Sequence, residues 1–474
     1  MIRSNITQVL CGAALSCAIA CGSAFAITAN PNVSIGKPLY IGGAINPNYI
    51  DPLVYTDGKL DANQLDYAYD FALNVGEGPS KLFITWDSRG DEAWAAERYV
   101  YAQGCQHNVM VGATLQNFLV LTSPNSTNGL DGDWQIVAQV GESGAASRGL
   151  AIDFEGMSWF RIMAQSPVVN LEEVGAYDIS NGAEDTWFFM GTSITQMGIK
   201  QFAVDSNFAE LIHARFPAHY PAMIRGGIAC LASHGVVDAI KFYLENAGNV
   251  KFWAIEMGTN DAWVGNTITV EQFASNMQTI IDSAKAHGIT PIIARIIATN
   301  EPVATWQVPQ EFLDVIDRLV KINNLPQGPD FYTHFLAHPE EFTIDGVHPN
   351  EKGAQSMHRL WAEAVIPLFQ NKKFEPILGT GGSDGSVAIH KTRNVQVVVP
   401  KVSVDGRAVS ISGVNEPVSV IIADLTGHIV WRGRIGGSTG VSKSSQILNT
   451  IPAGNYIVKI RGATTSYKSK ISIR

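Results

Sequence analysis

Four short apolar runs between residues 186 and 299 most restrict the folds open to this chain. They read TWFFM, AMIRG, KFWAIEM and PIIARIIAT, in that order. Continuous apolar runs of this length are typical of strands that are buried on both faces of a sheet. Parallel strands need long crossover connections, and the segments between these runs are long enough to supply them.

The intervening segments carry helical patterns. In residues 270–287 the apolar side chains fall on one helical face, and Thr269 and Gln272 form a capping-box pair at its start. Two further helices are expected over residues 309–325 and 350–369. Strand–helix alternation of this kind predicts a three-layer α/β domain with a parallel, flavodoxin-like sheet over residues 181–372.

The region before it, residues 30–180, has a different pattern. Short alternating runs are separated by loops rich in Gly, Asn, Asp and Ser, which predicts an antiparallel β-sandwich. The run FLVLTSPNSTNGLDGDWQIVAQV, followed by RGLAIDFEGMSWFRIM and EEVGAYDI, resembles the last strands of discoidin-like (galactose-binding-like, jelly-roll) sandwiches. That resemblance covers about the second half of the region.

The C-terminal part is predicted to be a separate small β domain. The Gly- and Ser-rich stretch LGTGGSDGSVAIH predicts a flexible linker within residues 373–394. In residues 395–474, the motifs DLTG and PAGNY resemble the C-terminal sorting sandwiches of type-nine secretion substrates, which implies the secretion machinery as a partner. An Ig-like stalk and a sugar-binding module remain open alternatives.

The charges of this part do not indicate nucleic-acid binding. Residues 395–474 carry ten Lys and Arg against three Asp and Glu, whereas the whole chain has a formal charge of −10. We interpret these cations as a solvated face rather than as a nucleic-acid site. We therefore expect no nucleic-acid partner.

The first 26 residues have the pattern of a signal peptide. Arg3 gives a positive start, residues 9–20 are apolar and small, and Ala24-Phe25-Ala26 supplies the cleavage pattern before Ile27. No later run reaches about 18 apolar residues, so no transmembrane span is expected. The prediction is a protein that is secreted or displayed at the cell surface.

Only Cys105 and Cys230 remain once residues 1–26 are removed. Because these two cysteines fall in different predicted domains, we expect no disulfide between them, and we expect Cys230 to be a small core residue. No group of Cys and His has the spacing of a zinc site, and the sequence implies neither a metal nor a cofactor.

Three separated segments carry residues suited to acyl transfer. Ser193 directly follows the run TWFFM, Asn260 follows KFWAIEM, and Asp345 and His348 share the loop before the last helix. A serine hydroxyl needs a neighbouring imidazole to remove its proton, and a carboxylate can hold that imidazole in the right tautomer. Asn260 and the Ser193 backbone N–H are candidate donors to an oxyanion.

These blocks resemble those of SGNH (GDSL-type) hydrolases. GTSIT, GTND and DGVHPN match three of the four blocks of that family in order and spacing, over residues 186–369. The resemblance implies Ser193 as nucleophile, His348 as general base and acid, Asp345 as its orienting carboxylate, and Asn260 as an oxyanion donor.

The sequence departs from the family pattern at two places. Thr192 stands where the family usually has Asp, a supporting residue. The second block, RGGIAC, leaves the register of its backbone donor open between Gly227, Ala229 and Cys230; we take Gly227 as the expected oxyanion donor.

The expected function is that of an exported serine esterase. Pairing a jelly-roll-like module with an SGNH domain resembles the carbohydrate esterases that remove acetyl groups from plant polysaccharides, so acetylated xylan or a related hemicellulose is the expected substrate. Two alternatives stay open: a lipolytic esterase or lysophospholipase with the same mechanism, and a surface sugar-binding protein without activity.

Overall fold

The computed structural model describes most of the chain. The described residues are 27–45, 53–60, 68–88, 93–102, 117–141, 143–168, 171–263, 265, 268–370, 401–405, 408–412, 418–424, 429–435, 445–447, 451–461 and 466–473. The expected signal peptide 1–26, Cys105 and the expected linker 373–394 lie outside the described residues.

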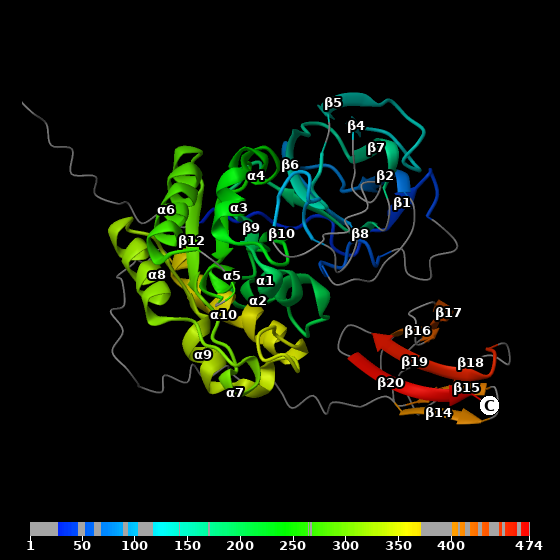
Figure 1. The fold of residues 1–474 in the computed structure, drawn as a ribbon. Coiled ribbons are helices and arrows are strands. Elements are labelled where there is room, and N and C mark those ends of the chain that lie inside the picture. Colours follow the sequence, from blue (N-terminus) through cyan, green and yellow to red (C-terminus); the bar gives the residue numbers. More distant parts are fainter. Residues whose placement is uncertain are drawn as a thin grey trace, which may run out of the picture.

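A five-stranded parallel sheet forms the centre of the α/β domain (Figure 1). Its strands lie in the order β10 (Ala222–Gly227), β9 (Thr186–Gly191), β11 (Phe252–Glu256), β12 (Thr290–Arg295) and β13 (Gln327–Asp330). The first four coincide with the four apolar runs, so the predicted parallel sheet is confirmed. The fifth strand was not expected, because its sequence, QGPD, has no apolar run.

Helices cover both faces of this sheet, as the three-layer prediction requires. The helical segments are α1 (Ser193–Gln196), the π-helix η1 (Met197–Gln201), α2 (Phe208–Arg215), α3 (Ser233–Asp238), α4 (Ile240–Ala247), α5 (Thr259–Ala262), α6 (Val270–Ala286), α7 (Glu301–Ala304), α8 (Gln310–Ile322), α9 (Phe331–Ala337), the 3₁₀ turn η2 (Pro339–Glu341) and α10 (Glu351–Phe369). One core cluster joins α3, α4, α6 and α8 to the sheet, and a second joins α2, α9 and α10 to its other face.

The N-terminal region forms two antiparallel sheets. One has the order β1 (Leu39–Ile41), β2 (Ala68–Asn74), β7 (Trp159–Val168), β4 (Phe118–Ser123) and β5 (Gln135–Val140); the other has β6 (Ser147–Asp153), β3 (Lys81–Ser88) and β8 (Leu171–Asp178). Buried side chains of both sheets, among them Phe71, Trp86 and Phe160, share one core cluster. The antiparallel two-sheet prediction agrees with this arrangement, and the likeness to galactose-binding modules stays a prediction.

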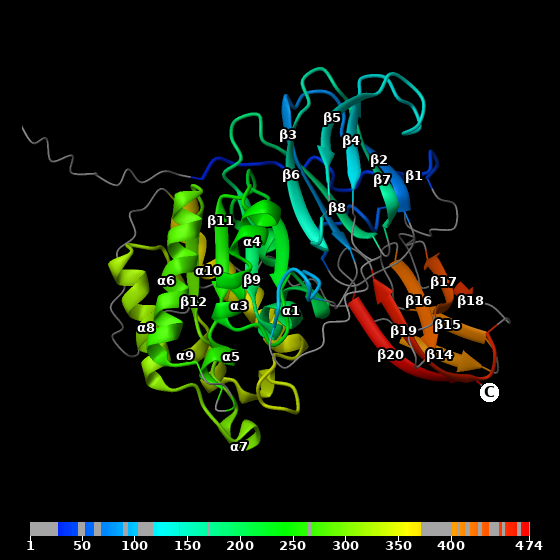
Figure 2. The ribbon, with the colours of Figure 1, turned by 45° about the horizontal axis from the view of Figure 1, so that its top comes forward.

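The sandwich and the α/β domain also share a core. Strands β6 and β3 lie beside β10, the edge strand of the parallel sheet (Figures 1 and 2). Trp94, from the segment between β3 and β4, packs its ring 4.8 Å from Phe188 of β9 and donates its backbone N–H to the carbonyl of Gly227. The sheets of the two parts therefore lie on either side of residue 180, but buried side chains of both parts belong to one hydrophobic core cluster.

Four charged side chains are buried where these two parts meet. Asp87 of β3 accepts hydrogen bonds from Arg225 of β10 and Lys200 of η1, and Lys200 also bonds Glu172 of β8. We call Asp87, Glu172, Lys200 and Arg225 the interface ion cluster. Burial of ionic groups is tolerated when they are paired, and here two cations face two anions.

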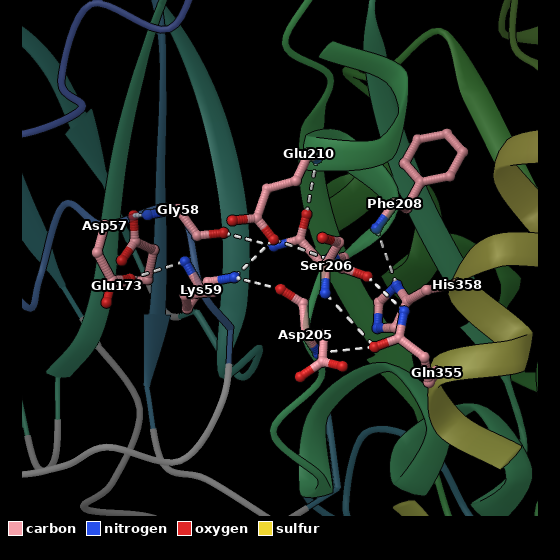
Figure 3. A network of polar contacts seen from close by, with 11 residues as sticks. Asp57, Gly58, Lys59, Glu173, Asp205, Ser206, Phe208, Glu210, Gln355 and His358 are labelled. Carbon is pink, nitrogen blue, oxygen red and sulfur yellow. Dashed lines mark hydrogen bonds and ion pairs between the residues drawn. The ribbon is translucent and has the colours of Figure 1, made fainter. Parts of the chain in front are cut away.

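A second polar network joins the segment 53–60 to α2 and α10 (Figure 3). Lys59 forms an ion pair with Glu210 at 2.6 Å, and Asn207 donates to the carbonyl of Gly58 at 2.7 Å. At the far end of this network, the buried ring of His358 accepts a hydrogen bond from the backbone N–H of Phe208 at 3.1 Å. A small cavity lies here, lined by Lys59, Leu60, Ile199, Phe202, Val204, Asn207, Met223 and His358.

The C-terminal residues form two further antiparallel sheets around their own core. They are β14 (Lys401–Asp405), β15 (Ala408–Ser412) and β18 (Ser445–Ile447), and then β17 (Ile429–Ile435), β16 (Val418–Asp424), β19 (Gly454–Arg461) and β20 (Ser466–Ile473). In the PAGNY motif, the hydroxyl of Tyr456 donates to the carbonyl of Pro452 at 2.8 Å. Across the described residues, no helix combines the length and apolar character needed to cross a bilayer.

Candidate active site

Ser193 is the first residue of α1, directly after β9 and the capping residue Thr192. The Thr192 side chain accepts a hydrogen bond from the backbone N–H of Ile194 at 3.1 Å, which caps the helix. The helix continues without a break into the π-helix η1. π-Helical turns are rare and recur at functional sites. Ser193 therefore lies at the carboxyl end of the sheet, where open α/β folds bind ligands.

Asp345 and His348 lie on a loop before α10. Phe342 and Pro349 form an antiparallel bridge that closes this loop, and the backbone N–H of Thr343 donates to the His348 carbonyl at 2.8 Å. Gly346 adopts φ = 69°, a conformation that other residues rarely take. The turn thus returns the chain so that two side chains three residues apart face each other.

The structure brings Ser193, His348 and Asp345 into one hydrogen-bonded line. Ser193 Oγ lies 2.8 Å from His348 Nε2, and His348 Nδ1 lies 2.8 Å from Asp345 Oδ2. The His348 and Asp345 side chains are 30% and 48% exposed, so the line is open to solvent. These are the contacts expected of a serine, a base and an orienting carboxylate.

Asp345 is held as an anion. Partial burial alone would raise the pKa of its carboxyl, but hydrogen bonds outweigh that effect and hold the pKa well below its usual range. Oδ1 accepts from the backbone N–H groups of His348 and Val347 and from the Thr343 hydroxyl, at 3.0, 2.8 and 2.7 Å. Oδ2 is left to face the imidazole.

Asn260 lies on the short helix α5, after β11. Its Nδ2 donates to the carbonyl of Leu231 at 2.9 Å, a contact that fixes the orientation of the amide plane. The next residue, Asp261, is buried and accepts from the backbone and hydroxyl of Ser233. Asn260 is thus tied to the loop that follows β10, and its expected role as an oxyanion donor stays a prediction.

The loop after β10 holds the other expected donors. Gly227 is the buried last residue of β10, paired in register with Gly191. The backbone N–H of Ile228 donates to the Gly191 carbonyl, and that of Ala229 donates to Gln196 Oε1 at 3.0 Å. Ala229 is therefore already engaged, and the choice of Gly227 stays a prediction.

The expectation that Cys230 is an unbridged core residue is wrong. Cys230 is disulfide-bonded, and its partner lies outside the described residues. The expectation assumed that the two predicted domains do not meet, whereas Ala93–Ala102 pack into the core of the α/β domain. Cys230 is half-buried and has φ = 56°, a left-handed conformation at the loop beside the site.

Sequence reasoning missed Glu256, a buried carboxyl beside the turn that carries Ser193. It is 1% exposed and lies opposite Gly191 in the sheet register. Its Oε2 accepts from the hydroxyls of Thr192 and Thr195 at 2.9 and 3.1 Å. Burial raises the pKa of Glu256, and the hydrogen bonds from these two threonines oppose that rise. The signal available in the sequence was a lone Glu at the end of an apolar run.

One group within the described part of the chain has ligand atoms placed closely enough for a metal ion. The atoms of His338, Glu340 and Glu341 lie within 4.8 Å of one another. Both carboxylates already have imidazole partners, His338 with Glu340 at 3.1 Å and His334 with Glu341 at 2.9 Å. These two pairs stabilise the turn before Thr343, and this explains why the side chains of the group lie close together.

Comparisons with known proteins gave structural likenesses only. No family model matches the chain, and no curated protein sequence matches it. A lipase/acylhydrolase from Enterococcus faecalis is 20% identical, with 38% of this chain and 94% of that chain covered and a TM-score of 0.32. The acetyl xylan esterase AlAXEase is 19% identical, with 38% and 99% covered and a TM-score of 0.33. A mutant acetyl-xylooligosaccharide esterase from Geobacillus is 17% identical, with 42% and 99% covered and a TM-score of 0.32.

Proposed function

We propose that this chain is a serine ester hydrolase of the SGNH type. The observation that carries the proposal is the continuous line from Ser193 Oγ through the His348 ring to Asp345 Oδ2, with 2.8 Å at each step. Ser193, at the start of α1, and His348, on the loop before α10, are 155 positions apart and meet at the carboxyl edge of a parallel sheet.

The mechanism follows from these positions. His348 Nε2 takes the hydroxyl proton as Ser193 Oγ attacks the ester carbonyl, and Asp345 stabilises the imidazolium that forms. His348 then protonates the leaving alkoxide, and the acyl group remains on Ser193. A water molecule, deprotonated by His348, releases the acid and restores the serine.

Three groups are proposed as donors to the oxyanion that forms in both steps. They are the Asn260 amide, the backbone N–H of Ser193, and a backbone N–H of the loop that begins at Gly227. The hydrogen bond from Asn260 to Leu231 supports its part, because a donor that is already oriented need not reorganise when negative charge develops. Removing one such donor typically raises the barrier by about 2.7–4 kcal/mol.

We propose an acetylated polysaccharide, such as acetylated xylan, as the substrate. Trp263 ends the helix that carries Asn260, and the residue is 51% exposed. An exposed aromatic residue three positions after Asn260 suits a sugar ring, which presents apolar C–H groups on its faces. The half-exposed His348 and Asp345 likewise suit a polymer that lies across the edge of the sheet.

A specific observation favours a second candidate, a lipolytic esterase with the same mechanism. Ile344, next to Asp345, is 99% exposed, and Val303, close to Gly346, is 48% exposed. Apolar side chains on this rim suit a longer acyl chain. The chain-length preference of the enzyme separates the two candidates.

The experiment that tests the function is acetate release from acetylated xylan, together with turnover of p-nitrophenyl esters of increasing chain length. Ser193→Ala is the control, because it removes only the nucleophilic oxygen. Acetate release that disappears in Ser193→Ala is the expected result. Turnover that prefers long acyl chains would favour the lipolytic candidate, and no turnover by the folded protein would contradict the proposal.

We also propose that the protein is exported, with residues 1–26 as a signal peptide and the C-terminal β domain as a sorting or anchoring element. The patterns Ala24-Phe25-Ala26, DLTG and PAGNY support this proposal. Sequencing the N-terminus of the mature protein tests the first part, with Ile27 as the expected first residue. A start at Met1 in the mature protein would contradict it.

A further inference from the structure

Hydrogen bonds to the neighbouring strand β11 hold the turn that carries Ser193. Glu256 ends β11 and lies opposite Gly191, which ends β9 immediately before Thr192 and Ser193. Its Oε2 accepts three hydrogen bonds: from the Thr192 hydroxyl at 2.9 Å, the Thr192 backbone N–H at 3.3 Å, and the Thr195 hydroxyl at 3.1 Å. All three donors flank Ser193 without involving it.

These contacts fix the backbone on both sides of the nucleophile. The Thr192 hydroxyl donates to Glu256 and accepts from the Ile194 N–H, so one chain of hydrogen bonds links Glu256 to the residues before and after Ser193. Thr195 closes the turn from the other side, and the backbone N–H of Gln196 donates to the Thr192 carbonyl at 3.0 Å.

Space at this point is restricted, so the contacts have few alternatives. A Cβ at position 191 would lie 2.0 Å from Thr195 Oγ1, which only glycine avoids. Thr192, Thr195 and Glu256 are each at most 3% exposed, so water does not compete for their hydrogen bonds. The Oε1 atom of Glu256 is also buried and has no hydrogen-bond partner among the described residues.

We propose that Glu256 is a positioning residue which, through Thr192 and Thr195, holds Ser193 Oγ within reach of His348 Nε2. This inference rests on the proposed function and deepens it. Thr192, which departs from the family pattern at this place, is the hydroxyl through which Glu256 acts. The carboxyl touches neither the substrate nor His348, so it acts on the rate by fixing the Ser193 backbone.

The test compares Glu256→Gln with Glu256→Leu. Glutamine keeps a carbonyl oxygen for the three donors, so kcat is expected within about threefold of wild type. Leucine removes the acceptor, and a nucleophile displaced by even 1 Å typically loses on the order of 10²-fold in kcat. KM is expected to change little, because the substrate contacts are untouched. A folded Glu256→Leu protein with wild-type kcat would overturn the inference.

If Glu256→Leu does not fold, a second pair of variants at Thr195 tests the positioning role of Glu256. Thr195→Val removes the hydroxyl with almost no change of shape, whereas Thr195→Ser keeps it. Valine is expected to lower kcat by about 3–10-fold and serine to leave it close to wild type. Equal kcat in the two variants would overturn the inference.

Two measurements separate this inference from the proposed function. Acetate release by the wild-type protein, absent in Ser193→Ala, tests the function alone. Crystal structures of wild type and Thr195→Val test the positioning without activity: the Ser193 Oγ to His348 Nε2 distance is expected to lengthen from 2.8 Å in the variant. An unchanged distance with an unchanged rate would refute the positioning role while leaving the esterase function in place.

Discussion

Asp87 in the sandwich and Arg225 in the edge strand of the parallel sheet form an ion pair of 2.7 Å between Oδ1 and Nε, and both side chains are only 2% exposed. Arg225 also donates to the carbonyl of Ser88 at 2.6 Å. The other oxygen of Asp87 accepts from Lys200, which lies in η1, directly after the helix α1 that begins at Ser193. One carboxylate therefore joins the sandwich to two elements of the α/β domain.

Asp87→Ala is expected to destabilise the whole protein. It removes the carboxylate that pairs with both Lys200 and Arg225 in the buried interface, and breaking a buried pair typically costs about 3–5 kcal/mol. Chemical denaturation followed by tryptophan fluorescence measures the loss. The matched control is Asp153→Ala on β6, because Asp153 is 85% exposed and its contact with Lys81 is 3.7 Å long. Equal stability of the two variants would contradict a supporting role for the sandwich.

Asp345→Asn is expected to lower kcat on the order of 10³–10⁴-fold while the fold is kept. The amide oxygen would keep the three donors Thr343, Val347 and His348 N–H, which forces the new NH₂ group toward His348 Nδ1. Nδ1 must then accept, and the proton moves to Nε2, where it blocks removal of the Ser193 proton. Steady-state kinetics with p-nitrophenyl acetate measure the effect.

Thr343→Val is the control for that substitution. It removes one of the three hydrogen bonds to Oδ1 and leaves the carboxylate facing His348 unchanged. We expect at most about a tenfold loss of kcat, because the two backbone donors remain. A loss as large as that of Asp345→Asn would show that the loop geometry, not the tautomer of His348, governs the rate.

His358 is expected to make the protein less stable in acid. Burial, aided by the charge of Lys59, lowers the pKa of this imidazole to about 3, and its Nδ1 accepts from the Phe208 N–H. Below the ordinary pKa of 6.5 the unfolded chain takes up a proton that the folded protein refuses. Above pH 6.5 the neutral His358 therefore costs no free energy of unfolding. As the pH falls toward 3, the free energy of unfolding decreases by on the order of 4 kcal/mol.

His358→Asn is the variant that tests this dependence. Asparagine keeps an oxygen where Nδ1 accepts from Phe208 but does not titrate, so stability at pH 5 relative to pH 7.5 is expected to fall less than in wild type. Denaturant midpoints at the two pH values measure the difference. His213→Asn, on the exposed side of α2, controls for the loss of a histidine in general. The same pH dependence in His358→Asn and wild type would contradict the assignment.

The predicted parts of the fold are those encoded in contiguous sequence. The apolar runs gave four of the five strands, and Thr269 with Gln272 forms the capping box expected at the start of α6. Ser193, Asp345 and His348 were predicted to meet because each lies in a short block at a strand or helix end. The parallel sheet places Ser193 at its carboxyl edge, and the turn at Gly346 lets Asp345 and His348 face each other.

The missed parts depend on contacts between distant residues. Glu256 meets Thr192 and Thr195 across 64 and 61 positions, and Arg225 meets Asp87 across 138. No spacing rule links such residues, and a buried charge looks the same in a sequence as an exposed one. The error on Cys230 has a related cause: the packing of Ala93–Ala102 into the α/β core cannot be read from a local pattern.

The substrate proposal makes opposite predictions for two exposed residues, Trp263, three positions after Asn260, and Ile344, next to Asp345. If a sugar ring stacks on the indole and covers about 55 Å² of it, the contact contributes about 1.4 kcal/mol, which is tenfold in KM. Trp263→Ala is therefore expected to raise KM for acetylated xylo-oligosaccharides about tenfold and to leave p-nitrophenyl acetate unaffected. Ile344→Ser should change neither value, because an acetyl group is too short to reach along an apolar rim. The lipolytic candidate reverses this pattern: Ile344→Ser would then raise KM for long acyl esters, and Trp263→Ala would not matter for oligosaccharides.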